Sequence, residues 1–374
     1  MADSTPDTAR SVPRHPYADV ADHQRWHRGV TWAPPGGLDP MVSTRFGIGP
    51  QDRIGTMGSC FAQHLSRHLA ASGLGYFVAE TAPDDLDGAE ATRRNYGTFS
   101  ARYGNVYTVE QAVQLFRRAY GDLTPTEAAW RRGPALVDPF RPLVEPEGFA
   151  DAASLEADRV LHLAATRRVF EESDVLVFTL GLTEAWRSRD DGSVFATAPG
   201  VNGGVYDPDR YEFVNHDIDQ VRHGLFDLCE KFRSVNPRGK VLLTVSPVPL
   251  IATYEPRHVL VSTMVSKSIL RVAADEAFRR FDFVDYFPSY ELIAPATSIT
   301  DHYEPDRRSV NDRAVAHVMR VFTHHYVKGL DWAAPSTGAL SASARLAMST
   351  SVADYPVICD EEAIAEAIEA SAGN

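Results

Sequence analysis

The sequence predicts an α/β protein, with a three-layer, doubly wound parallel sheet of about five strands. Strand-like apolar stretches begin near residues 53, 74, 174, 240 and 283, and stretches of helical periodicity lie between them. This alternation is typical of an open parallel sheet with helices on both faces. The stretch 174–180 is almost continuously apolar, as a parallel strand covered on both faces requires. Ligands of such sheets bind beyond the carboxyl ends of the strands.

The first strand runs through Gly58 and Ser59 into a helix. Phe61, Leu65 and Leu69 recur at helical spacing, and Gly73 ends the pattern. The Ser59 hydroxyl is therefore expected at the open edge of the sheet, beside the free N–H groups and positive dipole end of the helix. Both catalytic nucleophiles and anion sites use this arrangement.

The remaining elements follow from periodicity and turn residues. Helices are expected over about 109–120, 153–170, 217–233, 262–280 and from 309 or 311 to 326, and a second strand over 74–79. Residues 81–94, 121–148 and 186–215 are expected to be loops, with a short hairpin at 137–144 and a flap at 199–204.

Composition shifts divide the chain into three parts. Residues 1–45 are predicted to form a partly disordered N-terminal arm whose aromatic side chains, Trp26 and Trp32, pack on the core, as does the nearby Phe46. Residues 46–330 are the predicted α/β domain. Residues 331–374 form an acidic, Ala/Ser-rich tail, either poorly ordered or carrying a loosely docked helix near 361–370.

Charge and cysteine usage limit the partners. The net charge is −13 with no sustained Lys/Arg stripe, which disfavours binding to nucleic acid and to an anionic membrane surface. Three cysteines are too few and too scattered for a disulfide framework or a zinc site. No signal peptide and no apolar run of ~20 residues is visible. We therefore expect a cytoplasmic protein without a cofactor; its oligomeric state is not predicted.

The letters Gly58-Ser-Cys-Phe-Ala62 resemble the signature of the GSCFA family, a branch similar to the SGNH (GDSL-like) hydrolases. Further blocks resemble the family in order: 102–108, 178–186, 244–248 with Ser266-Lys267, and 286–291. The resemblance extends from about residue 16 to about residue 330. It implies that Ser59 is the nucleophile of ester hydrolysis or acyl transfer. The thiol of Cys60 is the rival nucleophile, although one residue further along a helix it should point roughly 100° away.

The resemblance also implies an oxyanion hole, made from the N–H of the nucleophile, a Gly of a second block and an Asn of a third. Gly58 adjoins the nucleophile, Gly104 and Asn105 resemble the second block, and Gly181 occupies the place of the third. In that third block Thr183 and Glu184 stand where the Asn is expected. A carboxylate cannot donate a hydrogen bond unless it is protonated, so either Thr183 or the Asn105 amide supplies the donor.

The general base departs from the superfamily pattern. SGNH enzymes carry Asp-x-x-His before the last helix, whereas this chain has Asp306-x-x-Ser309. His302 in the same loop and His258 after the 244–248 block are the candidate substitutes. Glu184 is a third candidate, or it forms a salt bridge, for example with Arg102. His64 and His68 have metal-like spacing, but no third ligand is evident, and no metal site is predicted.

The sequence therefore predicts a serine-dependent ester hydrolase or O-acyltransferase that forms an acyl-enzyme on Ser59 and acts on a small-molecule ester, by analogy that of a carbohydrate or other polyol. Pocket covering by the insertions 121–148 and 186–215 would favour transfer over hydrolysis, because it excludes water. The alternative is a non-catalytic carbohydrate-binding or scaffold protein that retains the fold without the base.

Overall fold

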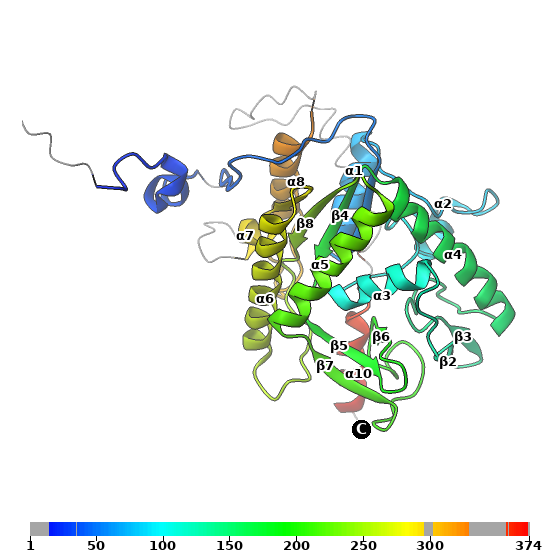
Figure 1. Cartoon of the computed structure of the whole chain (residues 1–374). Coiled ribbons are helices and arrows are strands. Elements are labelled where there is room, and N and C mark those ends of the chain that lie inside the picture. Colours follow the sequence, from blue (N-terminus) through cyan, green and yellow to red (C-terminus); the bar gives the residue numbers. More distant parts are fainter. Residues whose placement is uncertain (1–14, 35, 295–301, 329–356, 358, 373–374) are drawn as a thin grey trace, which may run out of the picture.

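The computed structural model describes residues 15–34, 36–294, 302–328, 357 and 359–372. Its central sheet has four parallel strands in the order β1-β4-β8-β9, and the two middle strands, β4 and β8, are labelled in Figure 1. These are β1 (Ile54–Gly58), β4 (Val175–Leu180), β8 (Lys240–Val245) and β9 (Val284–Phe287). Helices flank the sheet on both faces, which confirms the predicted α/β class.

The predicted strand at 74–79 is reduced to one bridge, in which Tyr76 pairs in parallel with Ile54 of β1. The Ile54 N–H donates to the Gly75 carbonyl, and the Phe77 N–H donates to the Ile54 carbonyl. With this bridge included, the spatial order is Tyr76, β1, β4, β8, β9, so the chain changes direction across the sheet at β1. The switch point between β1 and β4 is where open α/β sheets bind their ligands.

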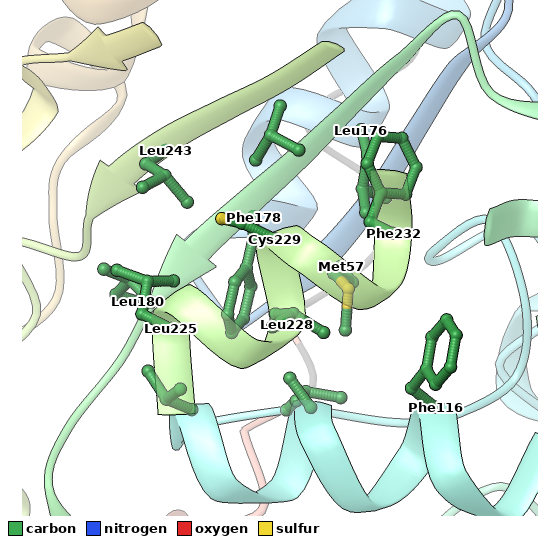
Figure 2. Close-up of a cluster of buried hydrophobic side chains, with 14 of the residues drawn as sticks. Met57, Phe116, Leu176, Phe178, Leu180, Leu225, Leu228, Cys229, Phe232 and Leu243 are labelled. Carbon is green, nitrogen blue, oxygen red and sulfur yellow. The ribbon is translucent and has the colours of Figure 1, made fainter. Parts of the chain in front are cut away.

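The two faces of the sheet carry different helices. Leu176, Phe178 and Leu180 of β4 point to a core shared with α3 and α5 (Figure 2). Val175 and Val177 point to the opposite core, shared with α1 and α8. The helices are α1 (Ala62–Ser72), α2 (Gly88–Arg93), α3 (Val109–Ala119), α4 (Ala152–Glu172), α5 (Ile218–Val235), α6 (Val259–Arg280), α7 (Ser289–Ile293), α8 (Asp312–Tyr326) and α10 (Glu362–Ala372).

Local sequence signals explain why the longer helices match the predicted ranges closely. The Asp151 and Asp217 side chains accept hydrogen bonds from N–H groups in the first turns of α4 and α5. Thr108 forms a capping box with Gln111 at the start of α3. Gly73 ends α1 in the left-handed conformation, with a φ of 72°.

The insertions are more ordered than predicted. The expected loop 186–215 contains a three-stranded antiparallel sheet of β5 (Glu184–Ser188), β6 (Val194–Phe195) and β7 (Tyr211–Asn215). The expected hairpin at 137–144 lies earlier, as β2 (Trp130–Arg132) and β3 (Ala135–Val137). Helix α2 occupies part of the expected loop 81–94. Trp130, Val137, Phe195 and Tyr211 form a small core that joins both insertions, and this tertiary packing explains order that local periodicity does not reveal.

The two ends of the chain behave differently. Short helical turns (Asp22–Gln24 and His27–Thr31) form part of the arm, where Trp26 is 67% and Trp32 62% exposed. The prediction that Trp26 and Trp32 pack on the core is therefore wrong. Phe46 does pack there, in contact with Tyr326. At the other end, Cys359, Asp360 and Glu361 are buried just before α10. The predicted disorder of residues 1–14 lies outside the described residues.

A buried ionic network fixes the segment that carries Gly104 and Asn105. The Arg102 side chain is 1% exposed, and it binds Glu145, Asp158 (2.8 Å) and the backbone carbonyls of Arg94 and Val144. Removing one partner of such a network leaves uncompensated buried charges, which is costly.

We expect Arg102→Ala to lower the free energy of unfolding by about 3 kcal/mol, because Glu145 and Asp158 would each lose one of two arginine partners and keep only Arg94 and Arg141. Urea unfolding followed by circular dichroism measures this. The control is Arg279→Ala, which removes the exposed ion pair with Asp275 (side chain of Arg279 76% exposed) and should cost less than about 1 kcal/mol. Equal losses for the two variants would contradict the network's role.

Candidate active site

Ser59 lies at the switch point, directly after β1 and before α1. Gly58, the last residue of β1, has a φ of +138°, and a side chain there would meet the Thr179 carbonyl oxygen at 2.4 Å. The Ser59 N–H donates to the same carbonyl (3.1 Å). The Ser59 side chain is 2% exposed, and its Oγ has no hydrogen-bond partner among the described residues. An unpartnered buried hydroxyl is costly in a structural role, so this oxygen is a candidate for chemistry.

The hydroxyl opens into a cavity of about 10 Å³, which holds about one water molecule. The cavity brings together the ends of three strands and two distant segments. Its lining comprises Ser59, Cys60, Tyr107, Gly181, Leu182, Ser246, Val248, Pro249, Leu250, Lys267 and Glu361. The convergence of Ser59, Gly181 and Ser246, each just beyond a strand end, agrees with the edge expected from the sequence.

Lys267 of α6 is the basic group of this cavity. Its ammonium donates to the Gly181 carbonyl at 2.5 Å, and a side chain built on Gly181 would lie 3.0 Å from the Ser59 Cβ. Burial lowers the pKa of Lys267 from its usual value to about 8, against the opposing charges of Glu361 and Cys60. A lysine with this pKa is roughly one tenth neutral at pH 7, far more than an ordinary lysine, and the neutral amine is the form that a general base requires.

Residues Cys359–Glu361, which we call the C-terminal segment, adjoin the cavity, and Glu361 is part of its lining. The Asp360 carboxylate accepts a hydrogen bond from the Asn105 amide (3.1 Å), and the Asp360 N–H donates to the Tyr107 hydroxyl (3.2 Å). The Asp360 carbonyl accepts from the Asn202 amide (3.4 Å). Burial raises the pKa of Asp360 to about 7.

Glu361 and Cys359 of the segment both contact the side chain of Arg308. The Arg308 guanidinium donates to the Glu361 carboxylate at 2.7 Å, while burial raises the pKa of Glu361 to about 7. The Cys60 thiol is hydrogen-bonded to Cys359, which raises the pKa of Cys60. The same bond, with help from Arg308, lowers the pKa of Cys359 to about 5. Cys60 is therefore a poor nucleophile in this state, because only the thiolate reacts.

The structure does not bring the predicted histidine bases to Ser59. His258 is exposed and caps α6, where its Nδ1 accepts from the Leu260 N–H (3.1 Å). His302 is buried, with its Nδ1 near the Ile293 carbonyl (3.2 Å). Asp306 is exposed and bonds to the Ser309 hydroxyl at 2.6 Å. None of these lines the Ser59 cavity.

Glu184 and Thr183 also face away from Ser59. The Glu184 carboxylate accepts from the Thr253 hydroxyl (2.6 Å), not from Arg102, and burial raises its pKa. Thr183 donates from its N–H to the Ser266 hydroxyl (3.0 Å) and from its own hydroxyl to Asn215 (2.8 Å). Both residues thus hold the loop after β4 in place, and neither lines the cavity.

Of the predicted oxyanion groups, only Gly181 lines the cavity, whereas Gly58, Gly104 and Asn105 do not; Asn105 offers a side-chain donor. The Gly181 N–H already donates to the Tyr107 carbonyl (3.0 Å), as the Ser59 N–H does to Thr179. Gly104 adopts a φ of +67° and turns the chain into Asn105. The Asn105 Oδ1 accepts from Gln63 of α1 (3.2 Å), which orients its amide N–H groups. That amide is bonded to Asp360 in this structure.

Sequence reasoning missed Lys267 and the C-terminal segment. A signal for Lys267 was present, because Ser266-Lys267 is one of the blocks that resemble the family, and a lysine on the helix after the third strand end can reach the same edge. No local pattern marks Cys359–Glu361, which lie in a stretch whose composition is typical of a tail. Of the insertions, 186–215 reaches the segment through Asn202 but neither insertion lines the cavity.

The chain belongs to the GSCFA family, whose model matches residues 53–322. Among curated proteins, no sequence match is found. The chain is similar to a solved mutant acetyl esterase with an acetate ion (12% identity, TM-score 0.32, 71% of this chain and 92% of that chain). It is also similar to a mutant acetyl-xylooligosaccharide esterase from Geobacillus Stearmophilus (11%, 0.31, 78% and 100%).

A third similar structure is a carbohydrate esterase family 2 enzyme plus carbohydrate binding domain from Corynascus thermopiles (Myceliophthora fergusii), at 14% identity and a TM-score of 0.30. The likeness covers 74% of this chain and 65% of that chain, so this chain spans less than two thirds of it.

Two further features lie away from the cavity. Asp39, His324 and His325 place potential metal-ligand atoms within 4.8 Å of one another, whereas His68 bonds to Thr323 (2.9 Å) instead of joining His64. Within the described ranges, no helix combines the length and the apolar character needed to cross a bilayer.

Proposed function

We propose that the protein is a serine-dependent ester hydrolase in which Ser59 is the nucleophile and Lys267 the general base. The observation that carries this proposal is the shared cavity at the switch point. It is lined by an unpartnered hydroxyl and by a buried lysine held on the adjoining Gly181 carbonyl. A nucleophile with a positioned base is the requirement for acyl chemistry.

In the proposed reaction, neutral Lys267 takes the Ser59 proton while Oγ attacks the carbonyl carbon of the ester. The resulting oxyanion is stabilised by the Asn105 amide. The tetrahedral intermediate collapses, the C–O bond breaks, and the Lys267 ammonium returns its proton to the departing alcohol. The acyl group is now an ester on Ser59. Lys267 then deprotonates a water molecule, whose attack releases the acid and restores Ser59.

Transfer to another alcohol follows the same steps when that alcohol replaces water, so an O-acyltransferase is the finer form of the same proposal. A carbohydrate or other polyol remains our expectation for the alcohol group. A cytoplasmic location likewise remains an expectation from the sequence.

The test is labelling with a fluorophosphonate, followed by peptide mass spectrometry. We expect one adduct on Ser59 in the wild-type chain and none in Ser59→Ala, with Cys60→Ala labelled like the wild type. An adduct that persists in Ser59→Ala and disappears in Cys60→Ala would assign the role to the thiol. A chain that ends at residue 356 lacks Glu361, which lines the cavity, and is labelled in parallel. If neither this chain nor the full chain acquires an adduct, the non-catalytic scaffold alternative is favoured.

A further inference from the structure

The cavity above Ser59 is too small for the proposed substrate. About 10 Å³ accommodates a single water molecule, whereas the smallest acyl group adds several non-hydrogen atoms. Glu361, close to the C-terminus, is one of the residues that line this cavity. Most of the other lining residues follow strands of the central sheet or lie on α6. Access to Ser59 therefore requires either a change in the framework or departure of the C-terminal segment.

The segment occupies the groups that the proposed mechanism needs. Asp360 places a carboxylate on the Asn105 amide, where the reaction would place its oxyanion. Glu361 shares the cavity with Ser59 and Lys267 and is paired with Arg308. Cys359 covers the Cys60 thiol, next to the nucleophile. Glu361 therefore lines the Ser59 cavity itself, while Asp360 and Cys359 bond to Asn105 and Cys60 beside it.

Several groups around Ser59 are bonded without the segment, whereas the Asn105 amide, the Tyr107 hydroxyl and Arg308 each have a bond to it. The Ser59 and Gly181 N–H groups, the Lys267 ammonium and the Asn105 carbonyl oxygen all have partners within the sheet domain. Next to the segment lies a second, larger cavity of about 240 Å³, lined by Cys60, Arg67, Arg308 and Cys359 among others. Departure of the segment would join this space to the Ser59 cavity and so create room for an ester.

We propose that the C-terminal segment, Cys359–Glu361, is an internal competitor that holds the Ser59 cleft closed and is displaced when substrate binds. This inference rests on the proposed function and adds its regulation. The segment carries no group that the proposed reaction requires. When it leaves, the carboxylates of Asp360 and Glu361 move from a buried position into water. The cleft is then open to an ester through the cavity beside Arg308.

The first experiment compares the full chain with a chain ending at residue 356, using the rate of fluorophosphonate labelling and kcat/KM for p-nitrophenyl acetate. We expect the truncation to raise both at least 10-fold, because a competent state populated at one tenth reduces apparent affinity by the same factor. A synthetic peptide of residues 357–372, added to the truncated chain, should inhibit competitively. Ser59-dependent rates that stay equal or fall would overturn the proposal and assign the segment to the catalytic apparatus.

The second experiment uses the full-length chain, in case the truncation impairs folding. Asp360→Ala removes the bond to Asn105 and should raise labelling, whereas the matched control Glu366→Ala, on the exposed part of α10, should leave it unchanged. An unchanged rate in Asp360→Ala, in a chain with wild-type circular dichroism, would contradict the competitor role.

Docking itself is measured without any activity, by bridging Cys60 and Cys359 with dibromobimane. We expect a fluorescent Cys60–Cys359 cross-link that is lost in Cys359→Ser and weakened in Asp360→Ala. If docking is observed while Ser59 is never labelled, even in the truncated chain, the proposed function fails and the docked segment stands as a structural element. If Cys60 is alkylated equally fast with and without residues 357–374, the segment does not close the cleft.

Discussion

Lys267→Met is expected to lower kcat for ester cleavage by about 10³-fold, within the range of roughly 10² to 10⁴ that a general base contributes. Methionine fills nearly the same buried volume and cannot accept the Ser59 proton. The substrate KM should change little, because the lysine holds the Gly181 carbonyl and does not form the path to the cleft. Steady-state kinetics with p-nitrophenyl acetate measures both constants.

The sign of the pH dependence follows from the lysine. Burial lowers the pKa of Lys267 to about 8, and the neutral amine is the active form. The rate should therefore rise with pH as Lys267 loses its proton and then level off, and Lys267→Met should lose this dependence. Lys231→Met, on the surface of α5, is the control. Rescue of Lys267→Ala by added methylamine would distinguish a base from a structural support; an unaltered pH profile in Lys267→Met would contradict the assignment.

Gly58→Ala is expected to lower the free energy of unfolding by about 4 kcal/mol and to abolish activity. The φ of +138° at Gly58 is strained for alanine, and the added Cβ would lie 2.4 Å from the Thr179 carbonyl oxygen. Relief of this clash would separate β1 from β4 at the position that places Ser59. Urea unfolding and the labelling assay measure the two effects.

The matched control for Gly58→Ala is Gly88→Ala, because Gly88 lies in α2, and nothing is within 4 Å of a side chain added there. That substitution should be neutral or stabilise the chain by about 0.4–1 kcal/mol. A Gly58→Ala variant that is as stable as the Gly88→Ala variant would show that the turn tolerates a side chain, and would remove the steric reason for a glycine before Ser59.

Local patterns predicted most of the sheet and one side of the site. The apolar run of β4 and the caps at Asp151 and Asp217 are encoded within a few residues, so their elements were predictable. Ser59 and Gly181 could be placed at one edge because parallel strands end together. Tyr76 forms only a bridge, and β5–β7 depend on packing between two insertions, which a linear pattern does not contain.

The chemical partners of Ser59 were less predictable for the same reason. His258 and His302 were candidates because the expected histidine is replaced by Ser309, but chemistry at the edge of a sheet depends on which side chains turn towards it. Lys267 lines the Ser59 cavity from a helix more than 200 positions later in the chain, and Glu361, about 300 positions away, lines it too. These are long-range contacts, and the spacing of letters does not encode them.

The family match ends at residue 322, whereas the residues that close the cleft begin at Cys359. Ser59 and Lys267 thus lie within the matched region, whereas the segment proposed to block them lies outside it. Under the competitor proposal, substitutions in the last few dozen residues would adjust how often the enzyme is open while leaving its turnover, once open, the same. Two proteins with the same matched core could then differ widely in resting activity through their tails alone.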